Sequence, residues 1–352
     1  MTRDVWVLGA TGRTGRAVVV RLRELGVPTV LVGRDAGRLA AVAEPLGART
    51  RTGTLEEVVA ALPTAAPAVV VNTVGPFTTT APPIARACPP GTHYVDVANE
   101  IPAFETLLAL HAVAEREGRT IVTGAGFGVL AAEAAVLRLM EDEPAPERVR
   151  VAVMPSVASE EGRIGTALAA TIVGQVPEGG RAVRQGRLVS APPVGATEVL
   201  TTPEGEAIPT TVAPFGELLA AWRASGAREV SAASSLAPSG PAVRLAIPAA
   251  DALLRIPGLS GLATAALARV PMRAAERPRA HSWAHARATW SDGRTREAWL
   301  RLDDALDFTA ATAARTAHRL LEGEGRPGSF TPGSLFGPEL ALAAGAEFTS
   351  VD

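Results

Sequence analysis

Short apolar runs alternate along the chain with longer segments whose apolar positions recur at helical spacing. The runs are rich in valine and leucine and have the length of buried strands. They lie at residues 5–8, 28–33, 68–72, 93–98 and 119–123. Between the first two runs, Val18, Leu22 and Leu25 fall on one helical face. Strands separated by helices predict an α/β fold whose N-terminal domain is a Rossmann-type, doubly wound parallel sheet.

The first run ends in three glycines spaced three residues apart, and a helical segment follows. In a dinucleotide-binding turn, Gly9 would permit the turn, Gly12 would let backbone approach a pyrophosphate, and Gly15 would let the helix pack closely. Amides at the helix N-terminus would then face an anion. The alternative is an ordinary strand–helix turn with incidental glycines. The predicted cofactor-binding residues of this turn are Gly9, Ala10, Thr11, Gly12, Arg13, Thr14 and Gly15.

The second run ends in Arg34, where an NAD-binding fold usually carries an acidic residue that holds the ribose 2′-hydroxyl. A guanidinium can instead bind a 2′-phosphate through two hydrogen bonds. Arg38 follows one helical turn later, and Asp35 is expected to cap the next helix. The sequence therefore favours NADP over NAD, with a solvated surface charge as the alternative role of Arg34.

Ligands bind beyond the carboxyl ends of the strands in such sheets, so residues after the later strands should complete the site. The cofactor-binding residues predicted there are Thr73, Val74, Gly75, Pro76 and Gly124. Catalytic candidates are fewer. Asn99 and Glu100 follow a strand and can orient substrate or donate a proton, although Glu100 can equally begin the next helix. Tyr94 is the single tyrosine, and its place near the start of its strand favours core packing over an acid role.

The amino-acid composition excludes several kinds of catalytic and binding site. Every one of the 34 basic residues is arginine, which excludes a Schiff-base lysine, a P-loop lysine and a Tyr-x-x-x-Lys pair. The one cysteine, Cys88, cannot form an internal disulfide or a thiolate metal site, and no metal is predicted. A net charge of −2 gives no electrostatic case for nucleic acid. With no apolar run of membrane-spanning length and no room for a signal peptide, we expect a soluble cytoplasmic protein, and a homodimer stays open.

The middle of the chain is mostly Ala, Val, Leu and Pro, which favours a largely apolar substrate. An apolar helix is expected at 258–270, packed on the core, lining a tunnel or contacting lipid. A hairpin is expected around the turn at 291–294. Alternation places His281 and His285 on one of its faces, about 13 Å apart and too far to share a metal. A solvated face is favoured there over a substrate-facing row.

Three blocks carry a family resemblance: residues 72–77, 91–100 and 124–127. In them the chain resembles the saccharopine dehydrogenase-like reductases, a family that includes trans-acting enoyl reductases of actinobacterial lipid assembly. The resemblance covers the first third of the chain and returns near 330–333. It implies an NADP-binding Rossmann domain at 1–128, an inserted α+β substrate domain at 129–307, and C-terminal helices at 308–352 that return to the first domain.

These observations predict an NADPH-dependent oxidoreductase. The resemblance favours hydride transfer to an activated C=C of an apolar small molecule, such as a lipid, polyketide or other secondary metabolite. Reduction of an imine C=N is the alternative that the saccharopine branch implies. A sensor that binds NADP without catalysis, or a lipid-associated scaffold, also stays open.

Overall fold

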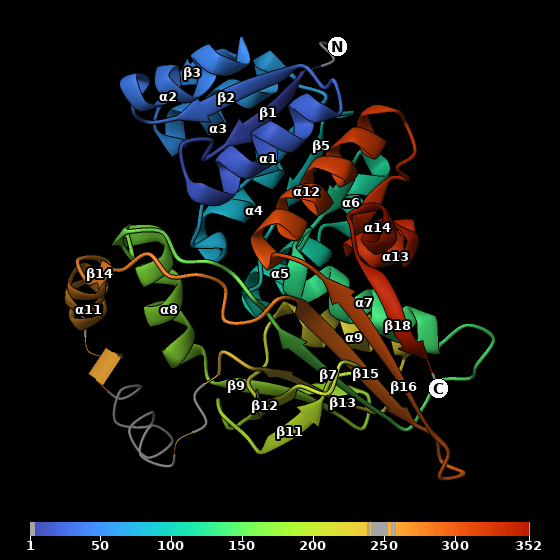
Figure 1. The fold of residues 1–352 in the computed structure, drawn as a ribbon. Helices are drawn as coiled ribbons and strands as arrows, with labels where there is room; N and C mark the ends of the chain where they lie inside the picture. Colours follow the sequence, from blue (N-terminus) through green and yellow to red (C-terminus); the bar gives the residue numbers. More distant parts are fainter. Residues whose placement is uncertain (1–3, 238–239, 241–252, 255, 257, 352) are drawn as a thin grey trace. The chain divides into compact units, whose positions relative to one another are not determined.

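The computed structural model describes the chain except for residues 1–3, 238–239, 241–252, 255, 257 and 352 (Figure 1). The described chain forms two compact units. The first contains Met1–Leu130 and Leu306–Gly345, and the second contains Ala131–Ala305 and Ala346–Asp352.

The first unit is built on a seven-stranded sheet in the order β17-β6-β5-β4-β1-β2-β3. All neighbouring strands are parallel, which confirms the predicted doubly wound sheet. The strands are β1 (Val5–Leu8), β2 (Thr29–Gly33), β3 (Arg49–Thr52), β4 (Val69–Asn72), β5 (His93–Asp96), β6 (Thr120–Val122) and β17 (Gly328–Phe330). Strand addition reverses direction between β1 and β4, so the switch point where such sheets bind ligands lies there.

Helices connect these strands. They are α1 (Arg13–Glu24), α2 (Ala36–Ala43), the 3-10 turn η1 (Glu44–Leu46), α3 (Leu55–Ala65), α4 (Phe77–Ala87), α5 (Ile101–Leu108), α6 (His111–Arg116), α7 (Phe127–Leu139), α12 (Ala305–Leu321), α13 (Pro332–Phe336) and α14 (Glu339–Ala343). Leu62, Ile84 and Leu107 from α3, α4 and α5 pack with Val70 and Ile121 of the sheet in one buried cluster. Burial of this face holds the strand ends in register.

The second unit is built on a mixed sheet of nine strands. Its order is β10-β9-β13-β7-β15-β16-β18, and β12 joins β11 to β13. The strands are β7 (Arg148–Met154), β9 (Gly180–Arg184), β10 (Arg187–Ala191), β11 (Thr197–Thr201), β12 (Ala207–Val212), β13 (Glu229–Ser234), β15 (Ser282–Thr289), β16 (Thr295–Leu302) and β18 (Glu347–Val351). The remaining elements are β8 (Gly162–Arg163), β14 (Pro271–Met272), α8 (Thr166–Glu178), α9 (Gly216–Ser225) and α11 (Leu259–Ala268).

The predicted hairpin is confirmed, because β15 and β16 pair from Ser282↔Leu302 to Thr289↔Thr295. The prediction that the face carrying His285 is solvated is wrong. His285 and Trp283 are buried, since side chains of β11 and β12 pack with Trp283 and Trp299. Alternation along one hairpin cannot show that another hairpin covers it.

Two further expectations need correction. The sequence placed all of 308–352 with the first domain, but β18 pairs antiparallel with β16 and belongs to the second unit. The apolar helix is present as α11, yet no residue of it is buried, so packing on the core is wrong. No helix in the described ranges is long and apolar enough to cross a membrane.

Candidate cofactor-binding site

The turn after β1 has a backbone that only glycine accommodates at its first position. Gly9 has φ +80°, and a Cβ there would lie 2.7 Å from Oγ1 of Thr73. The Gly9 amide donates to the carbonyl of Val32 at 3.0 Å, and the Gly12 amide donates to the carbonyl of Gly9 at 2.8 Å. The turn is therefore fixed against the adjacent strands β2 and β4 before any ligand binds.

Gly15 and Gly12 differ in what surrounds them. A Cβ at Gly15 would lie 2.2 Å from the carbonyl oxygen of Gly9, so α1 lies directly against the turn. Gly12 is exposed, has φ −77°, and its Cβ would meet only that carbonyl oxygen, at 3.2 Å. Gly12 thus leaves bare backbone at the N-terminus of α1, where helix amides favour an anion. This cradle, which a side chain would fill, fits a pyrophosphate.

The loop from β4 to α4 lies beside this turn. Thr73 donates to the carbonyl of Leu8 twice, through its amide at 3.0 Å and through Oγ1 at 2.7 Å. Thr73, Val74, Gly75 and Pro76 are all partly exposed. The structure therefore brings this predicted group together with the glycine turn at the switch point of the sheet.

Arg34 follows β2 and is exposed. Asp35 accepts a hydrogen bond from the Arg38 amide at 3.0 Å, which confirms it as the cap of α2. No described residue forms an ion pair or hydrogen bond with the Arg34 guanidinium. That group can therefore bind a phosphate without first losing another partner.

A buried chain of hydrogen bonds runs beneath these loops. Nδ2 of Asn72 donates to the Tyr94 hydroxyl at 3.1 Å, and that hydroxyl donates to Oδ2 of Asp96 at 3.0 Å. All three side chains are fully buried. This series of hydrogen bonds links the ends of β4 and β5. The sequence analysis did not identify Asn72 as part of the site.

Asp96 extends this series of hydrogen bonds to the end of β6. Its Oδ1 accepts hydrogen bonds from Oγ1 of Thr123 at 3.0 Å, the Gly124 amide at 2.9 Å and the Ala98 amide at 3.1 Å. Burial raises the pKa of Asp96 to about 6, although these hydrogen bonds oppose the rise. Burial, followed by the charge of Asp96, raises the pKa of Tyr94 well above its usual value. The geometry gives Tyr94 a place in the core, away from solvent.

Glu100 links the start of α4 to the loop that follows β5. Its Oε1 accepts from the Phe77 amide at 3.1 Å and its Oε2 from the Asn99 amide at 3.0 Å, and only 4% of its surface is exposed. Both oxygens therefore hold backbone in place, at the start of α4 and just before α5. Asn99 is the partly exposed one of the three catalytic candidates.

Gly124 has φ +79°, and a Cβ there would lie 2.3 Å from Cζ of Phe104. The next helix, α7, begins at Phe127, whose amide donates to Oγ1 of Thr309 at 3.0 Å. Thr309 lies on α12, 182 residues later in the chain. The returning C-terminal helix thus fixes the loop after β6, and no local sequence signal could have identified this partner.

Among the described residues outside these loops, Cys88, His285 and Glu297 have shifted pKa values. Burial raises the pKa of the Cys88 thiol to about 12, so it stays protonated. His285 bonds to Glu297 through Nε2 at 3.1 Å, and this bond, with help from Arg287, lowers the pKa of Glu297 to about 2. Burial lowers the pKa of His285, although the bond to Glu297 opposes this shift. Within the described residues, no group of His, Cys, Asp and Glu could hold a metal ion.

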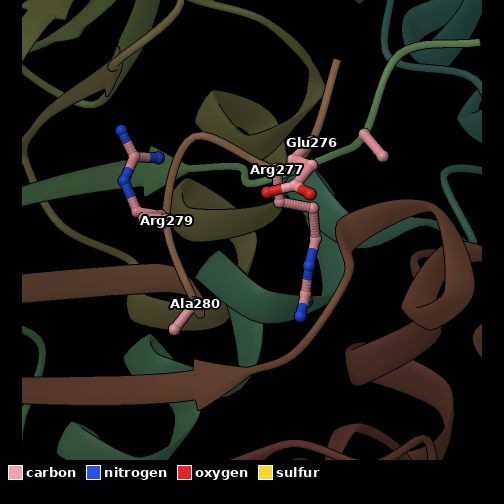
Figure 2. A pocket seen from close by; sticks show the side chains of 5 residues that line it. Glu276, Arg277, Arg279 and Ala280 are labelled. Atoms are coloured by element: carbon pink, nitrogen blue, oxygen red, sulfur yellow. The ribbon is translucent and has the colours of Figure 1, made fainter. Parts of the chain in front are cut away.

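A hollow of about 430 Å³ lies in the second unit (Figure 2). It is lined by Ala158, Glu276, Arg277, Arg279 and Ala280. Arg279 already donates to the carbonyl of Pro155 and to Glu206, and Figure 2 shows the Arg277 and Arg279 guanidinium groups pointing apart. This charged lining does not supply the apolar walls expected around the substrate.

Part of the chain is similar in sequence to known proteins. A family model for the saccharopine dehydrogenase NADP-binding domain matches residues 5–122. A protein of Mycobacterium tuberculosis strain H37Rv, provisionally named trans-acting enoyl reductase, is 33% identical over 147 residues, and its counterpart in strain CDC 1551 matches equally. The match covers 39% of this chain and 35% of each relative, so the chain spans only about a third of their length.

The fold as a whole also has a solved counterpart. Apo saccharopine dehydrogenase (L-Glu forming) from Saccharomyces cerevisiae superposes with a TM-score of 0.62 at 12% identity, covering 99% of this chain and 100% of that one. At this identity the likeness concerns the fold alone. Residues 5–122 thus match the NADP-binding domain of saccharopine dehydrogenase, and the chain as a whole has the fold of that enzyme.

Proposed function

We propose that this protein is an NADPH-dependent oxidoreductase that transfers a hydride to an activated C=C bond of a largely apolar small molecule. The observation that carries the proposal is the bare backbone at Gly12, at the switch point of the sheet and beside the loop at 73–76. The name of the mycobacterial relatives supports the choice of a C=C bond. Reduction of a C=N bond is the second candidate, because the matching family model is that of saccharopine dehydrogenase.

In this proposal the glycine turn binds the pyrophosphate through its amides, and Arg34 binds the 2′-phosphate. Thr73 to Pro76, together with Gly124, border the remainder of the cofactor. NADPH supplies the hydride, and the chain supplies position and polarity. Asn99 is the residue we assign to substrate orientation because it is partly exposed at the correct edge of the sheet. Glu100 holds Asn99 in place by accepting a hydrogen bond from its amide. Water is a sufficient proton source.

Thermal melting of the full chain with NADPH and then with NADH tests the cofactor step. Ligand at about one hundred times its Kd adds about 2.7 kcal/mol to the free energy of unfolding. We expect a rise in Tm of a few degrees with NADPH and a smaller one with NADH. No rise with either nucleotide would reject the proposed site and favour the scaffold alternative.

NADPH oxidation separates the reaction classes. We expect turnover with an enoyl thioester carrying a long acyl chain and none with a cyclic imine, and product analysis should show the saturated acyl group. Turnover of the imine alone would select the second candidate. A protein that binds NADPH yet oxidises it with neither substrate class would be a sensor.

A further inference from the structure

The second unit carries an apolar helix with no buried face. α11 contains no charged residue, and none occurs over 256–268. No side chain of α11 is buried, and Leu262 is 67% exposed. The helix packs along α8, which lies beside it in Figure 1.

Exposed apolar side chains concentrate on this helix pair and its flanks. Of the nine large hydrophobic side chains exposed on the described residues, five lie here. They are Ile172, Leu253, Ile256, Leu262 and Val270. Since folded proteins rarely gather many exposed apolar side chains in one region, this patch of five side chains indicates a contact surface.

The charges around the patch indicate what it contacts. Residues 253–280 contain five arginines and one acidic residue, whereas the whole chain has a net charge of −2. Arg269, Arg273 and Arg277 are exposed, and no ion pair joins them to another described residue. Glu160 and Glu161 precede β8, which pairs with β14, so the neighbourhood is not uniformly basic. A contact here rests first on the apolar side chains and second on the arginines.

We propose that the α8–α11 pair docks on the surface of an anionic lipid bilayer. Leu262 and its apolar neighbours would enter the acyl boundary, while Arg269 and Arg273 would contact lipid phosphates. A helix of ten residues is about 15 Å long, which suits a helix that lies on a bilayer rather than one that crosses it. A second copy of the chain would bring like-charged arginine clusters together around the same patch. The proposal does not depend on the reductase activity.

Vesicle flotation of the full chain tests it. We expect binding to phosphatidylcholine vesicles that contain phosphatidylglycerol, and much weaker binding to phosphatidylcholine alone. Leu262→Glu should reduce binding at least about tenfold, because a side chain that would be buried becomes charged. The matched control is Leu342→Glu on α14, where the leucine is 44% exposed outside the patch.

Charge is tested separately. The double variant Arg269→Glu/Arg273→Glu should lose most of its preference for the anionic vesicles, while Arg86→Glu/Arg116→Glu should keep it. Circular dichroism and NADPH-dependent melting show whether each variant is folded. Absence of flotation with anionic vesicles overturns the proposal, as does equal loss in Leu342→Glu. A dimer in light scattering that Leu262→Glu converts to a monomer, without flotation of either protein, would assign the patch to a second copy instead.

Discussion

The hydroxyl of Tyr94 donates a 3.0 Å hydrogen bond to Oδ2 of Asp96, two residues further along the same strand, and both side chains are completely buried. Residues two apart on a strand share a face, which places both groups under the loops at the strand ends. Asp96 also receives the amide of Gly124. One buried carboxyl group therefore links the ends of β5 and β6 directly, and it reaches the end of β4 through Tyr94 and Asn72.

Asp96→Asn should change how stability depends on pH. The folded-state pKa of about 6 lies above the usual 3.8, so the folded protein holds this proton more tightly than the unfolded chain. The contribution of Asp96 to stability is therefore fully present below about pH 4 and is lost as the pH rises through about 6. Between about pH 3 and pH 7 the free energy of unfolding of the wild type should fall by about 3 kcal/mol relative to the variant. Urea unfolding at a series of pH values across this range measures the difference. The same dependence on pH in both proteins would contradict a raised pKa of Asp96 in the folded state.

Tyr94→Phe distinguishes a core hydroxyl from a catalytic acid. The substitution removes a group bonded to Asn72 and Asp96, and should lower the free energy of unfolding by about 1–3 kcal/mol. The kcat of NADPH oxidation should change less than about threefold at a temperature where the variant is folded. A loss of about a hundredfold in kcat with unchanged stability would identify Tyr94 as the acid.

Gly12→Val and Gly15→Val form a matched pair. Gly12 has a φ that valine can adopt and meets only one atom closely, so the variant should fold and fail to bind NADPH. Gly15→Val would drive a side chain into the backbone of Gly9 and should lower Tm strongly. Calorimetric titration and melting report the two effects. Normal NADPH affinity in Gly12→Val would show that the pyrophosphate does not bind at Gly12.

Arg34→Ala should weaken NADPH binding about ten- to a hundredfold and leave NADH binding nearly unchanged, because a charge-assisted contact to the 2′-phosphate is lost. Arg86→Ala, on an exposed position of α4, is the control. Titrations with both nucleotides give the comparison. Equal losses for NADPH and NADH would show that Arg34 has no role in choosing between them.

Glu100→Gln and Asn99→Ala should distinguish a residue that stabilises the loops, Glu100, from a residue that orients substrate, Asn99. Glutamine offers one acceptor where Glu100 offers two, so an amide of Phe77 or Asn99 loses its partner and Tm should fall. Asn99→Ala should instead lower kcat with little change in Tm or in NADPH affinity. A wild-type kcat in Asn99→Ala would reject its assignment to substrate orientation.

Local features of the fold follow from the sequence. The glycine turn, the Asp35 cap and the hairpin at 291–294 each depend on backbone sterics or hydrogen bonds within a few residues, and the structure contains all three. The alternation of strands and helices was enough to predict a parallel, doubly wound sheet. The spatial grouping of the turn with residues 73–76 follows from that topology, because β1 and β4 are neighbours.

Other features depend on residues that are distant in the chain, and periodicity carries no information about them. Thr309 reaches the amide of Phe127 across 182 positions, and β18 leaves the first unit to pair with β16. His285 is buried although its strand alternates as a half-exposed strand would, while α11 is exposed although its composition is that of a core helix. The sequence by itself determined the glycine turn and the class of sheet, because short-range geometry dictates them. Only the tertiary structure decided which faces are covered and which polar groups meet in the core, because burial is a property of what packs against a segment.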